Sequence, residues 1–95
     1  QNLRRKGLMI TPNPFVRKFA LQYFDPPDNI EYINVYNQAG KLVWQKRIAV
    51  GRSGTFPTPG YQEIDLGNMS SGMYIVQIVY RSRATDTFRL IKVNN

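Results

Sequence analysis

Apolar residues occur along this chain in short segments, separated by turn-forming residues at intervals of roughly ten positions. The segments are rich in Val, Ile, Tyr and Phe, which favour strands, and none carries the period of an amphipathic helix. The pattern therefore predicts seven strands, which are Leu8–Ile10, Lys18–Phe24, Ile30–Tyr36, Lys41–Val50, Tyr61–Leu66, Met73–Tyr80 and Thr85–Val93.

Alternation within these segments predicts which side chains are buried, because successive residues of a strand point to opposite faces of a sheet. In the third segment, Ile33 and Val35 share one face and the tyrosines share the other. In the sixth segment, which is the most apolar, Val76 and Ile78 share a face. We expect these four aliphatic residues to lie in the core.

The connections between the segments are short and rich in turn-forming residues. Asn37-Gln38-Ala39-Gly40 has the length of a hairpin turn, with a glycine placed to supply positive φ. Short strands joined in this way predict an all-β fold, an immunoglobulin-like antiparallel β-sandwich of about seven strands. A small barrel is the main alternative. The cysteine and tryptophan spacing of antibody domains is absent, so the pattern indicates the architecture alone.

A chain of 95 residues is sufficient for one domain. Residues 1–7 lack an apolar pattern and are expected to be the end of a linker, which leaves residues 8–95 as the domain. The chain begins with Gln1 rather than Met, so we expect it to be a piece of a longer protein. Because the apolar pattern continues almost to Asn95, we expect a natural chain end there.

The composition removes most catalytic chemistry. The chain has no cysteine and no histidine, which excludes disulfides, thiolate nucleophiles, cysteine-bound metals and the usual general base near neutral pH. Only six carboxylates are present, and the serines lie in turn-like sequence where they are expected to bind backbone groups. We therefore predict that the domain is not an enzyme and needs no cofactor and no metal.

The charge balance favours an anionic partner, because thirteen Lys and Arg against six Asp and Glu give a net charge of +7. The basic residues are scattered, and the single run, Arg4-Arg5-Lys6, lies in the expected linker. Most aromatic residues are expected to pack in the core or across strands rather than to stack on bases. We predict no nucleic-acid partner. No apolar run reaches the ~18 residues of a membrane span, so none is expected.

Four stretches, read in order, carry a further signal. The first contains Pro-Asn-Pro after a short strand, the second a strand–turn–glycine–strand unit, the third Gly-x-Tyr at the start of an apolar strand, and the fourth a closing basic–apolar–apolar–lysine strand. The motifs are Ile10–Phe15, Ile33–Val43, Ile64–Val76 and Phe88–Lys92. In this order they resemble the C-terminal sorting domains, type A, of the type IX secretion system (Por secretion system). Met69 and Ser70-Ser71 depart from that family's usual leucine and proline.

The resemblance implies a non-catalytic signal that directs an exported protein through the periplasm and an outer-membrane translocon to the cell surface or medium. The implied partners are the translocon and sortase components, and anionic lipopolysaccharide through attachment of the passenger. The candidate recognition residues are Pro12, Asn13, Pro14, Gly40, Gly72, Tyr74 and Lys92.

Each motif also has an ordinary structural role. Prolines fix φ, glycines suit tight turns, and Lys92 is expected to be an exposed charge on an edge strand that discourages aggregation. The strand Leu8–Ile10 is likewise expected at a sheet edge, where another strand could pair with it. Two alternatives stay open: an accessory immunoglobulin-like module that binds carbohydrate or protein or acts as a spacer, and a basic nucleic-acid binder. A sorting domain must be last in its chain, whereas a spacer need not be.

Overall fold

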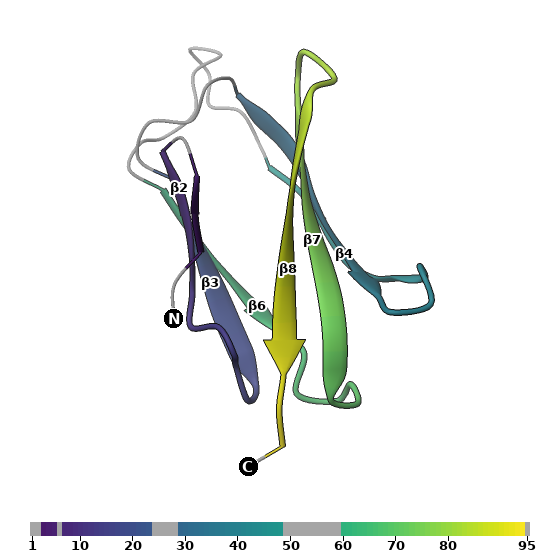
Figure 1. The fold of residues 1–95 in the computed structure, drawn as a ribbon. Coiled ribbons are helices and arrows are strands. Elements are labelled where there is room, and N and C mark those ends of the chain that lie inside the picture. The colour runs from purple at the N-terminus through teal and green to yellow at the C-terminus, as the bar shows by residue number, and fades with distance from the viewer. Residues whose placement is uncertain (1–2, 6, 24–28, 49–59, 95) are drawn as a thin grey trace.

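The computed structural model describes residues 3–5, 7–23, 29–48 and 60–94, and these residues form strands and turns without a helix (Figure 1). The strands are β1 (Leu3–Arg5), β2 (Leu8–Thr11), β3 (Lys18–Tyr23), β4 (Ile30–Asn37), β5 (Leu42–Arg47), β6 (Gly60–Asp65), β7 (Gly72–Tyr80) and β8 (Thr85–Lys92).

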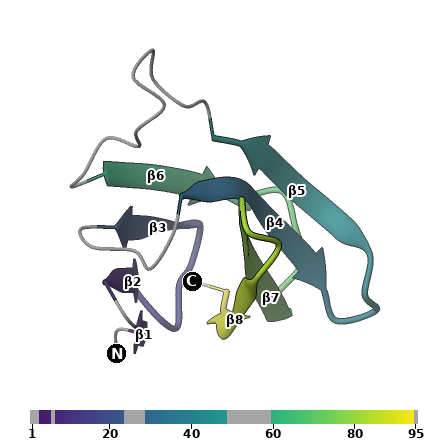
Figure 2. The same cartoon turned by 90° about the horizontal axis from the view of Figure 1, so that it is seen from above.

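The strands form two four-stranded sheets that pack face to face. One sheet has the order β1-β2-β3-β6 and the other β5-β4-β7-β8, and every neighbouring pair is antiparallel. Seen from above, the two layers are distinct (Figure 2). The predicted all-β antiparallel sandwich is therefore confirmed, and the barrel alternative is wrong.

The core lies between the sheets and follows the predicted alternation. Ile33, Val35, Val76 and Ile78 are all fully buried, as expected. Burying aliphatic side chains from both inner faces supplies the main driving force for a fold of this size. On the outer face of the second sheet, polar groups bind one another instead: the Asn34 amide donates to the Gln77 side chain over 3.1 Å.

Residues 3–5 differ from the expectation of a linker, since they pair with β2 as strand β1. Gly7 has φ +80°, a conformation that L side chains rarely adopt, and lies between the two strands. Glycine at position 7 is a turn signal that the sequence contains. The expected edge position of Leu8–Ile10 is therefore wrong, because β2 lies between β1 and β3.

Candidate recognition surface

The four sequence motifs meet at one end of the sandwich, where the C-terminus lies in Figure 1. We call this region the motif end. It is made of the loop Pro12–Arg17, the hairpin Asn37–Lys41, the loop Leu66–Gly72 and the segment Ile91–Val93. Backbone hydrogen bonds join these segments within one sheet, as from the Leu66 amide to the Arg17 carbonyl (2.9 Å), and between the sheets, as from the Phe15 amide to the Ile91 carbonyl (2.9 Å).

The first motif is attached to the edge of the last strand. The Asn13 side-chain carbonyl accepts a hydrogen bond from the Ile91 amide over 3.0 Å. The Phe15 amide donates to the Ile91 carbonyl, and the Val93 amide donates to the Phe15 carbonyl, both over 2.9 Å. We call this arrangement of Asn13, Phe15, Ile91 and Val93 the clasp. It occupies donors and acceptors at the end of β8 that an edge strand would otherwise expose.

The two prolines of the motif flank the clasp residue Asn13. Both the Thr11–Pro12 and the Asn13–Pro14 peptide bonds are cis. Proline has no backbone N–H, so neither residue brings a donor that would need a partner. The structure thus places Pro12 and Pro14 as exposed residues that shape the loop, while Asn13 makes the contact with β8.

Phe15 joins the first motif to the third through the core. Its side chain is buried, and its ring lies 4.8 Å from the Phe19 ring and 6.4 Å from the Tyr74 ring, both edge to face. Such pairs add to the burial of a large apolar side chain. Phe15 was not among the predicted site residues. The available signal was a large aromatic residue directly after the second proline.

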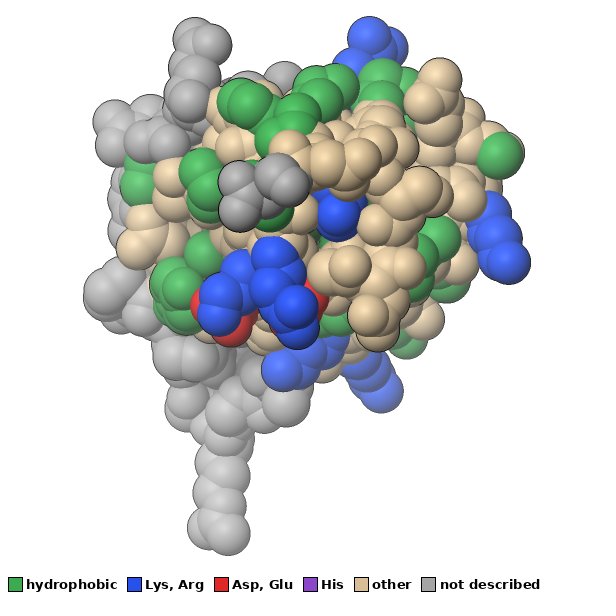
Figure 3. Space-filling view, turned by 90° about the horizontal axis from the view of Figure 1, so that it is seen from below, with side chains coloured by type: hydrophobic (Ala, Val, Ile, Leu, Met, Phe, Trp, Pro, Cys, Tyr) green, Lys and Arg blue, Asp and Glu red, His purple; other side chains and the backbone are tan. Residues whose placement is uncertain are grey.

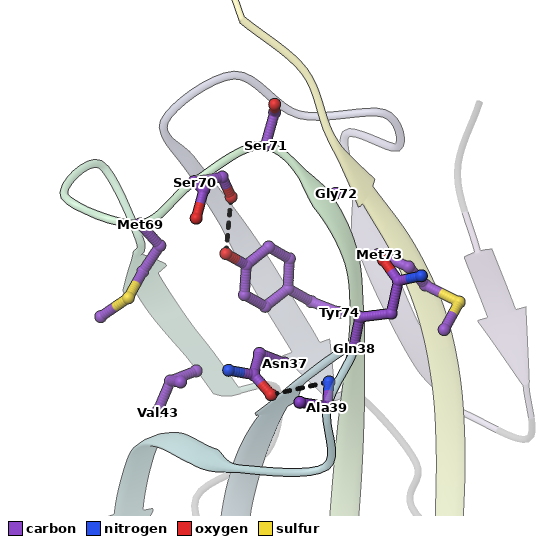
Figure 4. Close-up of a pocket in the computed structure, with 10 residues that line it drawn as sticks. All are labelled: Asn37, Gln38, Ala39, Val43, Met69, Ser70, Ser71, Gly72, Met73 and Tyr74. Atoms are coloured by element: carbon purple, nitrogen blue, oxygen red, sulfur yellow. Dashed lines mark hydrogen bonds between the residues drawn. The ribbon is translucent and has the colours of Figure 1, made fainter.

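The third motif shapes the loop before β7. Gly72 has φ +146°, and an added Cβ would lie 3.6 Å from the Gln38 side-chain oxygen, so the backbone conformation rather than space favours glycine. The buried Tyr74 donates its hydroxyl to the Ser70 carbonyl over 2.6 Å (Figure 4). The Gly-x-Tyr motif therefore turns the chain and then ties the loop back onto the strand.

The second motif shapes the facing hairpin. Gly40 has φ +84° and donates its amide to the Asn37 carbonyl over 2.9 Å. The Asn37 side-chain oxygen accepts from the amides of Ala39 (3.0 Å) and Lys41 (2.9 Å). Asn37 was also missed as a site residue, although asparagine at the start of a turn that contains glycine is a recognised turn signal.

Lys92 lies on the edge strand β8 as expected, but only 6% of the residue is exposed, so the expectation of a largely exposed side chain is wrong. It lies on the same face of β8 as Phe88 and Leu90, because side chains two residues apart share a face. Every buried side-chain nitrogen or oxygen in the described part of the chain has a partner, and no hydrogen bond or ion pair involves the Lys92 side chain. Its ammonium group therefore reaches solvent while its stem is buried.

A cavity of about 320 Å³ opens between the hairpin and the loop before β7 (Figure 4). None of its lining residues is charged; they are Asn37, Gln38, Ala39, Val43, Met69, Ser70, Ser71, Gly72, Met73 and Tyr74. Four of the five large apolar side chains that are exposed in the described residues lie at or beside this end: Val16, Leu42, Met69 and Ile91.

The charges at this end are mainly basic (Figure 3). The acids are paired: Asp65 with Arg17 over 3.1 Å, and Glu63 with Lys18 over 3.5 Å. The amide of Gly67, which donates to Asp65, is the main cause that lowers the pKa of that carboxyl, and the Arg17 charge adds to it. Lys41 has no acidic partner in the described ranges.

Neither a cluster of metal-ligating side chains nor a membrane-spanning helix occurs among the described residues. Within residues 3–5, 7–23, 29–48 and 60–94, no three metal-ligating side chains of His, Cys, Asp or Glu are grouped together. The same ranges contain no helix with the length and apolar character needed to cross a membrane. The features that the motif end does show are shape, apolar exposure and positive charge.

Comparison with known proteins identifies a family. The family model described as the secretion system C-terminal sorting domain matches residues 9–93, which include all four motifs. No curated protein and no solved structure matches the chain. The matched family marks proteins for export to the cell surface or the medium. The chain therefore belongs to the type IX secretion C-terminal sorting domain family.

Proposed function

We propose that this domain acts without catalysis as a folded signal, and that the outer-membrane translocon of the type IX system reads it at the motif end. The observation that carries the proposal is the convergence of the four motifs. The clasp joins Asn13 to Ile91, residues 78 positions apart in the sequence. The motif end therefore exists only when the chain is folded.

The roles of the motif residues support recognition rather than chemistry. Asn13 holds the last strand, Gly40 and Gly72 set backbone turns, and Tyr74 ties a loop. None of these contacts activates a nucleophile or positions a general base. We assign Pro12, Asn13, Pro14, Gly40, Gly72 and Tyr74 to shaping the surface. Lys92 is assigned to direct contact, since its ammonium reaches solvent.

The later steps of the proposed route act on the passenger rather than on this surface. After passage through the periplasm and the outer membrane, a sortase would separate the domain from its passenger. The passenger would then be attached to anionic lipopolysaccharide or released. Such a cut would fall on the N-terminal side of the domain, because a passenger that carries a C-terminal sorting domain precedes it in the chain.

A fusion experiment tests the proposal. Residues 1–95 are joined to a fluorescent passenger with an export signal, in a bacterium that has a type IX system. We expect the passenger on the surface or in the medium, and in the periplasm after removal of residues 90–95. Asn13→Ala removes the clasp acceptor and should also reduce export, whereas Ser82→Ala in the β7–β8 turn is the matched control. If the intact fusion stays periplasmic while an established sorting domain exports the same passenger, the accessory-module alternative is favoured.

A further inference from the structure

We infer that the cavity at the motif end receives an apolar side chain from an acidic segment of a protein partner. The inference rests on the proposed function and names the chemistry of the partner that would read this surface. It is carried by three observations: the uncharged lining of the cavity, its rigid walls and the unpaired cations around it.

The lining is uncharged and combines polar groups with apolar side chains that an apolar group could contact. Val43 and Met69 lie on one side of the cavity and Met73 on the other, with the Tyr74 ring between the two walls (Figure 4). Methionine side chains are flexible and polarizable, so they adapt to the shape of an inserted group. A volume of about 320 Å³ accommodates a bulky side chain such as Leu or Phe. A charged group would lose its hydration there without gaining a partner.

Both walls are fixed before any partner binds. The Tyr74 hydroxyl holds the loop at Ser70, and the Asn37 side-chain oxygen holds the hairpin through the amides of Ala39 and Lys41. With that oxygen occupied, the Asn37 amide nitrogen points towards the Met69 and Val43 side (Figure 4). It is therefore available to donate to a backbone carbonyl of the partner. A preformed site lowers the entropy lost on binding.

Two cations adjoin the cavity. The Lys41 amide donates to the side chain of Asn37, and Lys92 is paired in register with Gly72, and both Asn37 and Gly72 line the cavity. In the part of the chain that the structure describes, neither Lys41 nor Lys92 has an acidic partner.

The four acids in the described residues are engaged elsewhere. Glu31, Glu63 and Asp65 form ion pairs with other basic residues, and Asp86 accepts from the Tyr80 hydroxyl. An uncharged centre inside a charged rim is the usual anatomy of a protein interface. An anionic lipid headgroup would complement the rim alone and would leave the cavity unused, so a protein segment fits the observations better.

Titration of the isotope-labelled 95-residue chain tests the chemistry, with amide chemical shifts as the readout. Three peptides are compared: Glu-Asp-Leu-Phe-Asp-Glu, its serine form Glu-Asp-Ser-Ser-Asp-Glu, and its basic form Lys-Lys-Leu-Phe-Lys-Lys. We expect the first to bind at least about tenfold more tightly than the other two. Its saturable shifts should centre on Gln38, Ala39, Ser71 and Met73. Equal binding of all three, or shifts centred elsewhere, would overturn the inference. Stronger shifts of the same amides with lipopolysaccharide micelles would favour a lipid partner instead.

Two variants with matched controls connect the cavity to export. Ala39→Trp fills the cavity from an exposed position, and Ala84→Trp places the same side chain in the β7–β8 turn. Lys41→Glu reverses a charge beside the cavity. Its control, Arg81→Glu, reverses a charge at the other end of the sandwich. We expect Ala39→Trp and Lys41→Glu to have the same melting temperatures as their controls. Their affinity for the first peptide and the exported fraction of their fusions should each fall by about tenfold.

The outcomes separate this inference from the proposed function. If the parent fusion is exported and the cavity variants are exported equally well, the cavity inference is wrong and the sorting function stands. If the parent fusion is not exported, the proposed function fails, and the peptide titration still decides whether the cavity binds an acidic apolar segment.

Discussion

The two ends of the sandwich close their loops in different ways. At the end where β7 joins β8, the upper end in Figure 1, the described bonds of the turn stay within one sheet: the Arg83 amide donates to the Tyr80 carbonyl, the Tyr80 hydroxyl donates to Asp86, and the Arg81 amide donates to the Asn29 carbonyl beside β4. At the motif end, the clasp joins Asn13 to Ile91 across 78 residues. A local turn is sufficient to connect two strands. Long-range bonds fix how separate loops lie relative to one another, and this relative position is what a partner can recognise.

The two ends also differ in their turn residues. At the upper end, Gly7 and Arg83 both have positive φ (+80° and +79°), so one of its two described positive-φ positions tolerates a side chain in an unfavourable conformation. The motif end uses Gly40 and Gly72 at its positive-φ positions. The difference indicates that the motif end is the more closely specified of the two, and each of the following predictions tests that view.

The largest effect is expected for Phe15→Ala. This change removes a buried ring that packs against two others and leaves a void between the clasp and the core. The free energy of unfolding should fall by about 3–5 kcal/mol, measured by urea denaturation. The adjacent Val16→Ala, at an exposed position, should change it by less than about 0.5 kcal/mol. Similar values for the two variants would show that the clasp does not depend on the core.

A pair of tyrosine variants separates stability from export. Tyr80→Phe removes a bond to a carboxylate at the upper end and should lower stability by about 1.5–3 kcal/mol. Tyr74→Phe removes a bond to a carbonyl at the motif end and should cost about 0.5–1.5 kcal/mol. Thermal melts and the fusion assay are measured for both. We expect only Tyr74→Phe to reduce export, although it is the less destabilised protein. The reverse result would make export a simple consequence of stability.

Two substitutions of Lys92 separate the role of its buried methylene stem from the role of its ammonium group. Lys92→Ala removes buried methylene groups and should cost about 1–2 kcal/mol, since each buried CH₂ contributes ~0.8 kcal/mol. Lys92→Met retains most of the stem and removes the charge, so it should be nearly as stable as the parent. Both variants should show a partial loss of export if the ammonium is contacted. Full export of Lys92→Met would restrict Lys92 to a packing role.

The smallest effect concerns Asp65. Its lowered pKa means that the folded state favours the charged carboxylate, so the contribution to stability is present at neutral pH and is lost as the pH falls through that pKa. The parent should melt slightly above Asp65→Asn at about pH 7, and the difference should vanish by about pH 2. Added salt at ~1 M should reduce the part due to Arg17 and leave the part due to the Gly67 amide. A difference that grows in acid would contradict this sign.

Much of the fold follows from local patterns in the sequence. Alternation identifies Ile33 and Val35 as core residues, and the same alternation from Phe88 through Leu90 places Lys92 on the inner face. The expectation of an exposed Lys92 was wrong because its charge was given more weight than its register. The turn at Gly7 was missed although its residue type was available.

The arrangement of the motif end could not be derived in this way. The clasp depends on which strand forms the sheet edge beside the Pro12–Arg17 loop, and hydrophobic periodicity contains no information on strand order. The sequence resemblance indicated which residues belong together. Only the sheet topology brings Asn13 to Ile91, and Gly72 within reach of Gln38.

The clasp has a consequence for when the signal comes into existence. A ribosome releases a chain from its amino end, so Asn13 emerges long before Ile91 and Val93, the residues that it and Phe15 bind. A chain whose synthesis stops before residue 91 would contain three of the four segments and lack the bonds that fix the first of them. We expect such a fragment to leave the translocon without a surface to bind. The clasp would thus make export depend on completed synthesis, so that truncated products are retained.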